Sequence, residues 1–156
     1  RGRGKVLSFL QSLEDTQTRE GDTAFNTCAR IFQARHHRRG MVLVLSDFLF
    51  PSGFEEGLKF LQYHRHDVYC LQVQDSNDTR CDWKGDVELE CVETNQRQRV
   101  TVSATEAKLY EEAVSTWNQN LQRCCARRGI GLAATTPESP FEVVIQDILR
   151  RGGLVA

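Results

Sequence analysis

The stretch "RGMVLVLSDFLFPSGFEEGLKFL", residues 39–61, joins a purely apolar run to an acid and then to a helical pattern. Residues 41–45 have no polar alternation, which is typical of a strand that is covered on both faces inside a parallel sheet. Asp47 follows shortly after this run. At that position Asp47 could cap or bond the amides of the loop before the next helix, accept a phosphoryl group, or ligate a metal ion.

Strands and helices alternate along the rest of the chain. The runs at 67–74 and 130–136 are short and apolar enough to be internal strands. The runs at 87–92 and 99–103 alternate with a period of two and predict an antiparallel hairpin with one solvated face. Strands separated by helices predict an α/β fold with a parallel sheet flanked by helices, in which the hairpin is an insertion.

Three helix starts carry a serine followed three residues later by a glutamate, a pair that satisfies two amides of the first turn. The pairs are Ser52/Glu55, Ser103/Glu106 and Ser139/Glu142. The helix after Ser103 spans about 104–127. Its apolar stripe contains Leu109 or Tyr110, Val114, Trp117, Leu121 and Cys124.

Two further helices precede the strand at 41–45. The first carries Val6, Phe9, Leu10 and Leu13 at helical spacing. The second begins near Asp22 or Thr23 and stops at Gly40. Its predicted apolar face consists of Phe25, Cys28, Ile31 and Phe32.

The composition narrows the function classes. The chain has 156 residues, of which 40% are hydrophobic and 26% charged, and its net charge is −1. These values indicate one globular domain. Its net charge is too small to attract nucleic acid or an anionic membrane electrostatically. No apolar stretch is long enough to span a bilayer. The cysteines show no C-x-x-C spacing, so we expect reduced thiols in the cytoplasm rather than disulfides or a zinc site.

The candidate chemistry lies at the carboxyl ends of the strands, where ligands bind in open parallel sheets. Asp47 ends one strand, and Asp22 and Thr23 begin a helix after Gly21. Carboxylate and hydroxyl oxygens are the ligands that Mg²⁺ prefers. The alternative is that Asp22 or Thr23 caps its helix and Asp47 bonds loop amides. We find no phosphate loop or nucleophile elbow, so a catalytic interpretation lacks a nucleophile–base pair.

Four segments, in order, resemble a bacterial family of von Willebrand factor A-like proteins, the domain-of-unknown-function family numbered fifty-eight, which is associated with MoxR-type AAA+ ATPases. They are "RGRGKVLSFLQSLED", "EGDTAFNTCARIFQARHHRRGMVLVLSDF", "HDVYCLQVQD" and "VELECVETNQRQRVTVS". The resemblance covers nearly the whole chain. It implies a Rossmann-like, von Willebrand factor A-type sheet whose N-terminal strands lie upstream of Arg1. Residues 1–156 would then form a single, N-terminally truncated domain.

The resemblance also implies a metal-ion-dependent adhesion site. Thr23 matches the threonine of that site and Asp47 matches its aspartate, whereas its Asp-x-Ser-x-Ser loop has no match in these residues. The chain has Gly21-Asp22-Thr23 where the family usually reads Gly-Gly-Thr, so Asp22 could help or crowd a cation. We therefore expect Mg²⁺ in the complete protein and no bound cofactor in this piece.

The function implied by the resemblance is a non-enzymatic protein–protein interaction module. It would work with a MoxR-type ATPase in the assembly or activation of protein complexes, in the cytoplasm or as the cytoplasmic part of a membrane-anchored protein. One alternative is an enzyme that uses Asp47 as phosphoacceptor or nucleophile. Another is a weak nucleic-acid-binding module that uses the basic run at 34–40, although we expect that run to be a solvated helix end.

Self-association is a further expectation. The resemblance places the usual neighbour of the strand at 41–45 upstream of Arg1, which leaves this strand at a sheet edge. Native proteins protect such edges with charge, proline or bulges, and the segment contains no charged residue or proline. We therefore expect a homo-oligomer formed through residues 41–46.

Overall fold

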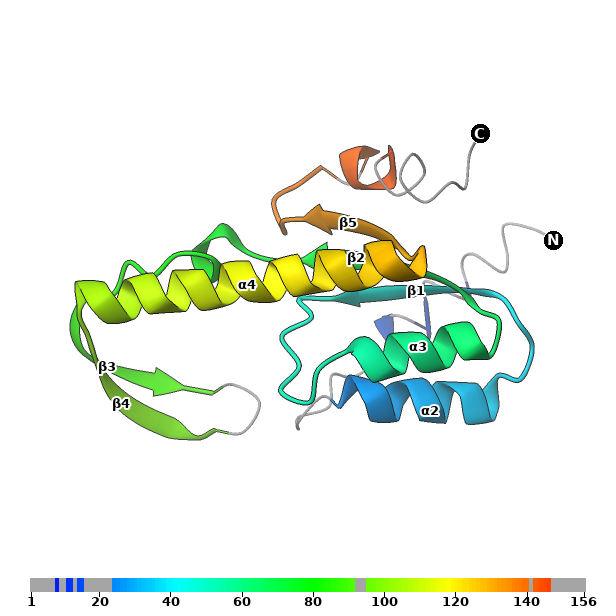
Figure 1. Cartoon of the computed structure of the whole chain (residues 1–156), viewed down its shortest axis with the longest axis horizontal. Helices are drawn as coiled ribbons and strands as arrows, with labels where there is room; N and C mark the ends of the chain where they lie inside the picture. The colour runs from blue at the N-terminus through cyan, green and yellow to red at the C-terminus, as the bar shows by residue number, and fades with distance from the viewer. Residues whose placement is uncertain are drawn as a thin grey trace.

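The computed structural model describes residues 8, 11–12, 14–15, 24–91, 95–140 and 142–146, and its centre is a three-stranded parallel sheet (Figure 1). The strand order is β1–β2–β5, with β1 at Met41–Ser46, β2 at Asp67–Val73 and β5 at Gly131–Thr135. Both pairings are parallel. The predicted α/β class and these three strands are confirmed.

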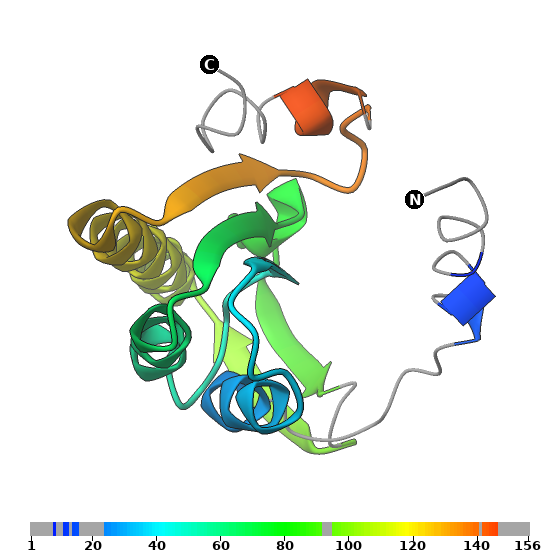
Figure 2. The same cartoon turned by 90° about the vertical axis from the view of Figure 1, so that its right-hand side faces the viewer.

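Helices α2 (Phe25–Arg35), α3 (Glu55–Tyr63) and α4 (Ala104–Arg128) lie on one side of the sheet (Figure 2). Val42 and Val44 of β1 face this side and pack against the core together with Leu132 of β5. The buried residues of this core are Phe25, Ala29, Phe48, Phe50, Phe54, Leu58, Leu61, Val68, Cys70, Leu121, Cys124, Cys125 and Ile130. Helix packing on this face thus matches the prediction.

The other face of the sheet is covered unevenly. Tyr69, Leu71 and Ala133 are buried there, and Val144 of the helical stretch 142–146 packs against them. By contrast, the β1 side chains on this face remain exposed: 57% for Met41, 45% for Leu43 and 61% for Leu45. The prediction that the strand at 41–45 is covered on both faces is therefore wrong within the described residues. The reason is that β1 is the outermost of the strands that the structure describes in this sheet, and the 142–146 stretch packs over β2 and β5 instead.

The predicted hairpin forms a separate two-stranded antiparallel sheet. It consists of β3 (Gly85–Glu90) and β4 (Arg97–Val102), which are joined to β2 through the short 3-10 helix η1 (Ser76–Asp78). Opposite charges face each other across the pair, with Arg97 bonded to Glu90 and Arg99 to Glu88. In Figure 1 the hairpin lies beside the first turns of α4, away from the three-stranded sheet.

The start of α4 confirms the predicted capping box. Ser103 Oγ accepts a hydrogen bond from Thr105 N–H, and Glu106 reaches back to the amide and hydroxyl of Ser103. These bonds hold the pKa of the Glu106 carboxyl below its ordinary value. The helix ends at Gly129, whose left-handed φ of 65° is readily adopted by glycine.

The predicted helix start at Ser52 differs from the structure. Helix α3 has Phe54 at its N-cap without a side-chain bond, so the Ser52/Glu55 box is wrong. A residue of α2 takes over this role, because Asn26 Oδ1 accepts the Gly57 N–H at 2.7 Å. At the third start, the Ser139 hydroxyl accepts a bond from Thr136 N–H in the preceding loop.

The predicted apolar faces were partly wrong. In α2 the buried residues are Phe25, Ala29 and Gln33, while Cys28 and Ile31 are exposed, and the helix ends at Arg35 rather than at Gly40. Gln33 is buried because its Oε1 bonds His66 Nε2 at 2.7 Å. In α4, Leu109 and Tyr110 are exposed because the first turns extend beyond the sheet. The helix predicted from Val6, Phe9, Leu10 and Leu13 falls on residues outside the described part of the chain, although Ser8, Gln11, Ser12 and Glu14 are helical.

We predict that Gly57→Ala destabilises the fold by about 1–3 kcal/mol. A Cβ at this position would lie 2.5 Å from Phe25 Cε1 and 2.9 Å from Asn26 Oδ1. The Phe25 ring is buried and stacked on Phe50, so it has little room to shift. Urea unfolding measures the change. Gly40→Ala is the control, since nothing lies within 4 Å of its added Cβ, and an equal effect of both substitutions would contradict the steric explanation.

Candidate functional site

Asp47 lies at the carboxyl end of β1 and is exposed. Its Oδ1 accepts a hydrogen bond from Leu49 N–H at 3.0 Å and a second from the Ser46 hydroxyl at 3.3 Å. Ser46 Oγ in turn accepts the Phe48 N–H at 3.0 Å. Asp47 therefore has the amide-bonding role that was one of its three predicted roles, and its carboxylate is held at the surface in a defined turn.

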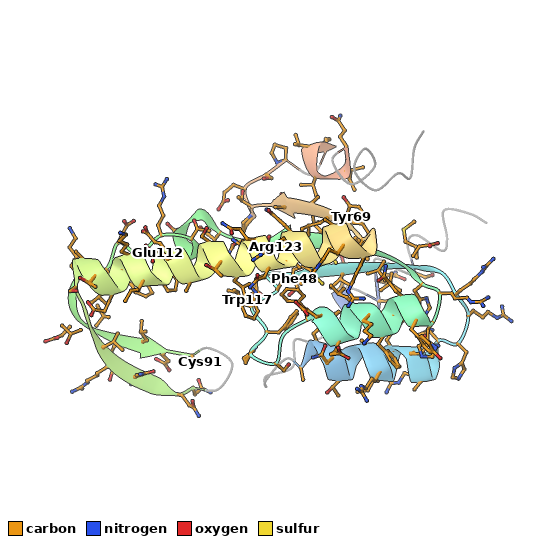
Figure 3. All side chains as sticks on the ribbon, viewed as in Figure 1. Phe48, Tyr69, Cys91, Glu112, Trp117 and Arg123 are labelled. Atoms are coloured by element: carbon orange, nitrogen blue, oxygen red, sulfur yellow. The ribbon has the colours of Figure 1, made fainter. Side chains whose placement is uncertain are left out.

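Phe48 makes this turn unusual. Its φ of 62° lies in the left-handed region, which bulky residues rarely adopt. The side chain is nevertheless completely buried, with its ring edge-on to those of Phe50 and Phe54. Trp117 of α4 donates its indole N–H to the Phe48 carbonyl at 2.8 Å, and Figure 3 shows the two labelled side chains next to each other. Packing and this hydrogen bond together hold the backbone in its strained conformation.

A polar cluster lies beside this turn. Gln72 of β2 is buried, and its Nε2 donates to Asn118 Oδ1 at 2.8 Å and to the Asp47 carbonyl at 3.4 Å. Asn118 Nδ2 donates to Gln74 Oε1 at 2.9 Å. This cluster connects the ends of β1 and β2 to α4. Sequence reasoning missed it, although two glutamines at alternate positions of an otherwise apolar strand were a signal.

Of the residues predicted to form the metal site, the structure describes Asp47. Asp22 and Thr23 lie outside the described residues, so their position relative to Asp47 stays a prediction. Among the residues that are described, no group of three or more His, Cys, Asp or Glu side chains is arranged to hold a metal ion. A single carboxylate that already accepts two hydrogen bonds does not make a magnesium site. The described donors alone therefore do not fit the cation that the resemblance implies.

Three of the cysteines form a buried cluster in the core. Cys70 of β2 and the adjacent Cys124 and Cys125 of α4 are unbridged and buried in the core. A hydrogen bond with Cys125 and burial raise the pKa of the Cys70 thiol, and burial raises that of Cys124. The hydrogen bond with Cys70 lowers the pKa of the Cys125 thiol. Cys70 and Cys124 are therefore the members of the cluster that burial makes poor nucleophiles and poor metal ligands.

The chain belongs to the DUF58 family, described as a protein of unknown function, whose family model matches residues 1–120. It is also similar to the uncharacterized protein MAV169 of Mycobacterium avium, with 29% identity over 153 residues, which cover 96% of this chain and 87% of that protein. No solved structure matches the chain. Within the described residues, none of the helices combines the length and apolarity that crossing a membrane requires.

We predict that this chain binds Mg²⁺ only at millimolar concentration or above, on the order of 1 mM or weaker, because one carboxylate does not offset the dehydration of the ion. Isothermal titration calorimetry measures the affinity, with Asp47→Ala as the comparison. A micromolar affinity that is lost in Asp47→Ala would contradict the prediction and would mean that donors outside the described residues complete the site.

We also predict that Trp117→Phe destabilises the fold by about 1–3 kcal/mol, because it leaves the Phe48 carbonyl without its indole donor while keeping an aromatic ring. Thermal unfolding followed by circular dichroism measures the change. Trp83→Phe is the matched control, since Trp83 is the other tryptophan of the chain and is exposed. Equal melting temperatures for the two variants would show that the indole bond does not support the turn.

Proposed function

We propose that this protein is a non-enzymatic protein–protein interaction module of the von Willebrand factor A-like type. In this proposal it acts in the cytoplasm with a MoxR-type AAA+ ATPase in the assembly or activation of protein complexes. Membership of the DUF58 family supports the proposal, and so does the resemblance of the motifs around Asp47.

The observation that carries the proposal is the turn at the end of β1. It presents an exposed carboxylate, Asp47, beside an exposed apolar side chain, Leu49. The turn is rigid because Phe48 is buried beneath it and bonded to Trp117. A charged and an apolar group on a pre-ordered loop at the carboxyl edge of a parallel sheet suit recognition of a partner, since little conformational freedom is lost on binding.

The same geometry favours binding over catalysis by Asp47. Its Oδ1 already accepts two hydrogen bonds within the turn, which engage this oxygen in holding the loop. We propose that partner binding depends on Mg²⁺ only when further oxygen donors lie near Asp47.

We predict that Asp47→Asn weakens binding to a MoxR-type ATPase of the same organism by about tenfold or more. The amide keeps an oxygen that can accept the Leu49 N–H, so the free energy of unfolding should change by less than about 0.5 kcal/mol. Biolayer interferometry measures binding, and thermal unfolding measures stability. The control is Asp67→Asn, which removes an exposed carboxylate at the opposite end of the sheet.

The outcome distinguishes a binding role from a structural one. Partner binding that survives Asp47→Asn while the melting temperature falls sharply would mean that Asp47 only stabilises its turn. Equal losses of binding in both variants would point to a general charge effect instead of a site at Asp47.

A further inference from the structure

We propose that the end of the molecule at which the strands begin is a docking surface for an anionic membrane. This surface, called here the basic end, is made by the carboxyl ends of α2, α3 and α4 and the loops that follow them. Figure 1 shows these three helix ends on the side of the molecule where β1 and β5 start. The inference rests on the charges and contacts at that end and not on the proposed function.

Exposed arginines gather at the basic end from three separate segments. The end of α2 and the loop after it contribute three, the loop after α3 contributes one, and the last turn of α4 contributes one. They are Arg35, Arg38, Arg39, Arg65 and Arg127. Within the described residues, none of these arginines forms an ion pair. The segments 30–40, 59–68 and 122–131 contain a single acidic residue, Asp67.

The helix ends alone do not account for this charge. The carboxyl end of a helix carries a partial negative charge of about half a unit, which nearby cations complement. Three helices therefore offset about 1.5 positive charges, and Asp67 offsets one more. The arginines of the basic end exceed this sum, so the basic end keeps a net positive charge.

The opposite end of the molecule is acidic. Exposed carboxylates follow the strands or begin the next helix on that side, and they include Asp47, Glu55, Glu56, Asp78 and Glu138. The net charge of −1, from which we expected no attraction to an anionic membrane, therefore combines a positive and a negative end. An anionic surface attracts one end of such a molecule and repels the other, which gives the bound molecule a defined orientation.

Hydrogen bonds between the loops hold the basic end together. His66, in the loop after α3, is buried, and its Nδ1 lies 3.3 Å from the Gly40 nitrogen of the loop after α2. Its Nε2 lies 2.7 Å from Gln33 Oε1 in the last part of α2. Gln62 of α3 donates its side-chain amide to the Arg128 carbonyl of α4 at 2.9 Å. The three helix ends are thus fixed relative to one another, so little backbone freedom is lost on docking.

An exposed aromatic side chain belongs to the same surface. Tyr63 is the last residue of α3 and is 80% exposed. Its ring lies edge-on to that of His64, with 5.3 Å between the ring centroids. Tyrosine is enriched at membrane–water interfaces because its ring is apolar and its hydroxyl is polar. Arginines together with an interfacial tyrosine therefore suit the headgroup region of an anionic bilayer.

The basic end is less suited to nucleic acid. Single strands are bound by several aromatic residues along a charged groove, and duplexes are read by a helix or a β-ribbon that enters a groove. The basic end offers Tyr63 and the ends of three helices rather than the side of one helix. A planar anionic surface requires no groove and no register, and each arginine that approaches it adds to binding.

Vesicle sedimentation tests the proposal. We expect the chain to sediment with phosphatidylcholine vesicles that contain about 30% phosphatidylserine and to stay in solution with phosphatidylcholine alone. Binding should weaken as the ionic strength rises from about 0.05 M to about 0.3 M, because salt shortens the Debye length.

Charge reversal at separate helix ends identifies the surface. One variant combines Arg35→Glu with Arg38→Glu at the end of α2. A second combines Arg65→Glu with Arg127→Glu at the ends of α3 and α4. Each should lower the vesicle partition coefficient about tenfold or more. Circular dichroism of each variant verifies that the fold is retained.

Two controls separate the basic end from other effects of these substitutions. Arg80→Glu combined with Lys84→Glu changes the net charge equally at exposed positions between β2 and β3, and should lower binding by less than about threefold. Arg65→Lys combined with Arg127→Lys keeps the charge of the basic end and should retain binding within about threefold.

Quenching by brominated lipids tests the orientation. In a Trp83→Phe background, Tyr63→Trp places a fluorescent reporter on the basic end, and Trp83→Phe alone gives the baseline from Trp117. Vesicles that carry brominated acyl chains should quench the reporter at position 63. The unmodified chain should show no quenching of Trp83, which is exposed in the segment between β2 and β3.

Several results would overturn the proposal. Absence of binding to phosphatidylserine vesicles, or equal binding to phosphatidylcholine alone, would exclude electrostatic docking on a membrane. Equal losses in the Arg80/Lys84 control and in the two arginine variants would point to net charge rather than to the basic end. Loss of binding in the lysine variant would mean that Arg65 and Arg127 act through the fold. Binding to a DNA duplex or to single-stranded RNA without binding to vesicles would make the basic end a nucleic-acid surface.

Discussion

Val42 lies beside Val68 and Val44 beside Cys70 in the parallel ladder that joins β1 to β2. This register sends alternate residues of β1 to opposite faces, because side chains alternate along a strand. The even-numbered valines meet the core beneath the helices, and the odd-numbered Leu43 and Leu45 are placed beside Tyr69 and Leu71. The ladder therefore determines which side chains are buried and where Asp47 leaves the sheet.

The turn after β1 depends on the same arrangement through α4. Phe48 adopts its left-handed conformation while completely buried, and its carbonyl is bonded by Trp117. The same turn of that helix also supplies Asn118, which bonds Gln72 of β2. The capping box at Ser103 and the glycine at 129 set the two ends of α4. The local signals at the two ends of α4 thus position Trp117 and Asn118. These two residues support a strained turn that lies far from them in the sequence.

The sequence was informative where a structure depends on neighbouring residues and less so where it depends on distant ones. The strands and the Ser103 capping box follow from local patterns, and both are present. Ser52 failed as a cap because Asn26, on another helix, bonds the first turn of α3. The buried face of α2 was misplaced for a related reason, since Gln33 is buried by a bond to His66 that no periodicity indicates. In the site, the position of Asp47 at the carboxyl end of a strand could be predicted, whereas the support from Trp117 and Gln72 required tertiary contacts.

Asp47 takes part in the turn through its side chain and in the polar cluster through its backbone. Its Oδ1 accepts the Leu49 N–H, and its carbonyl accepts the side-chain amide of Gln72. A substitution of the side chain leaves the bond to Gln72 in place, because that bond uses the backbone carbonyl. Binding at the turn can therefore be altered at the Asp47 side chain without removing the link from the ends of β1 and β2 to α4.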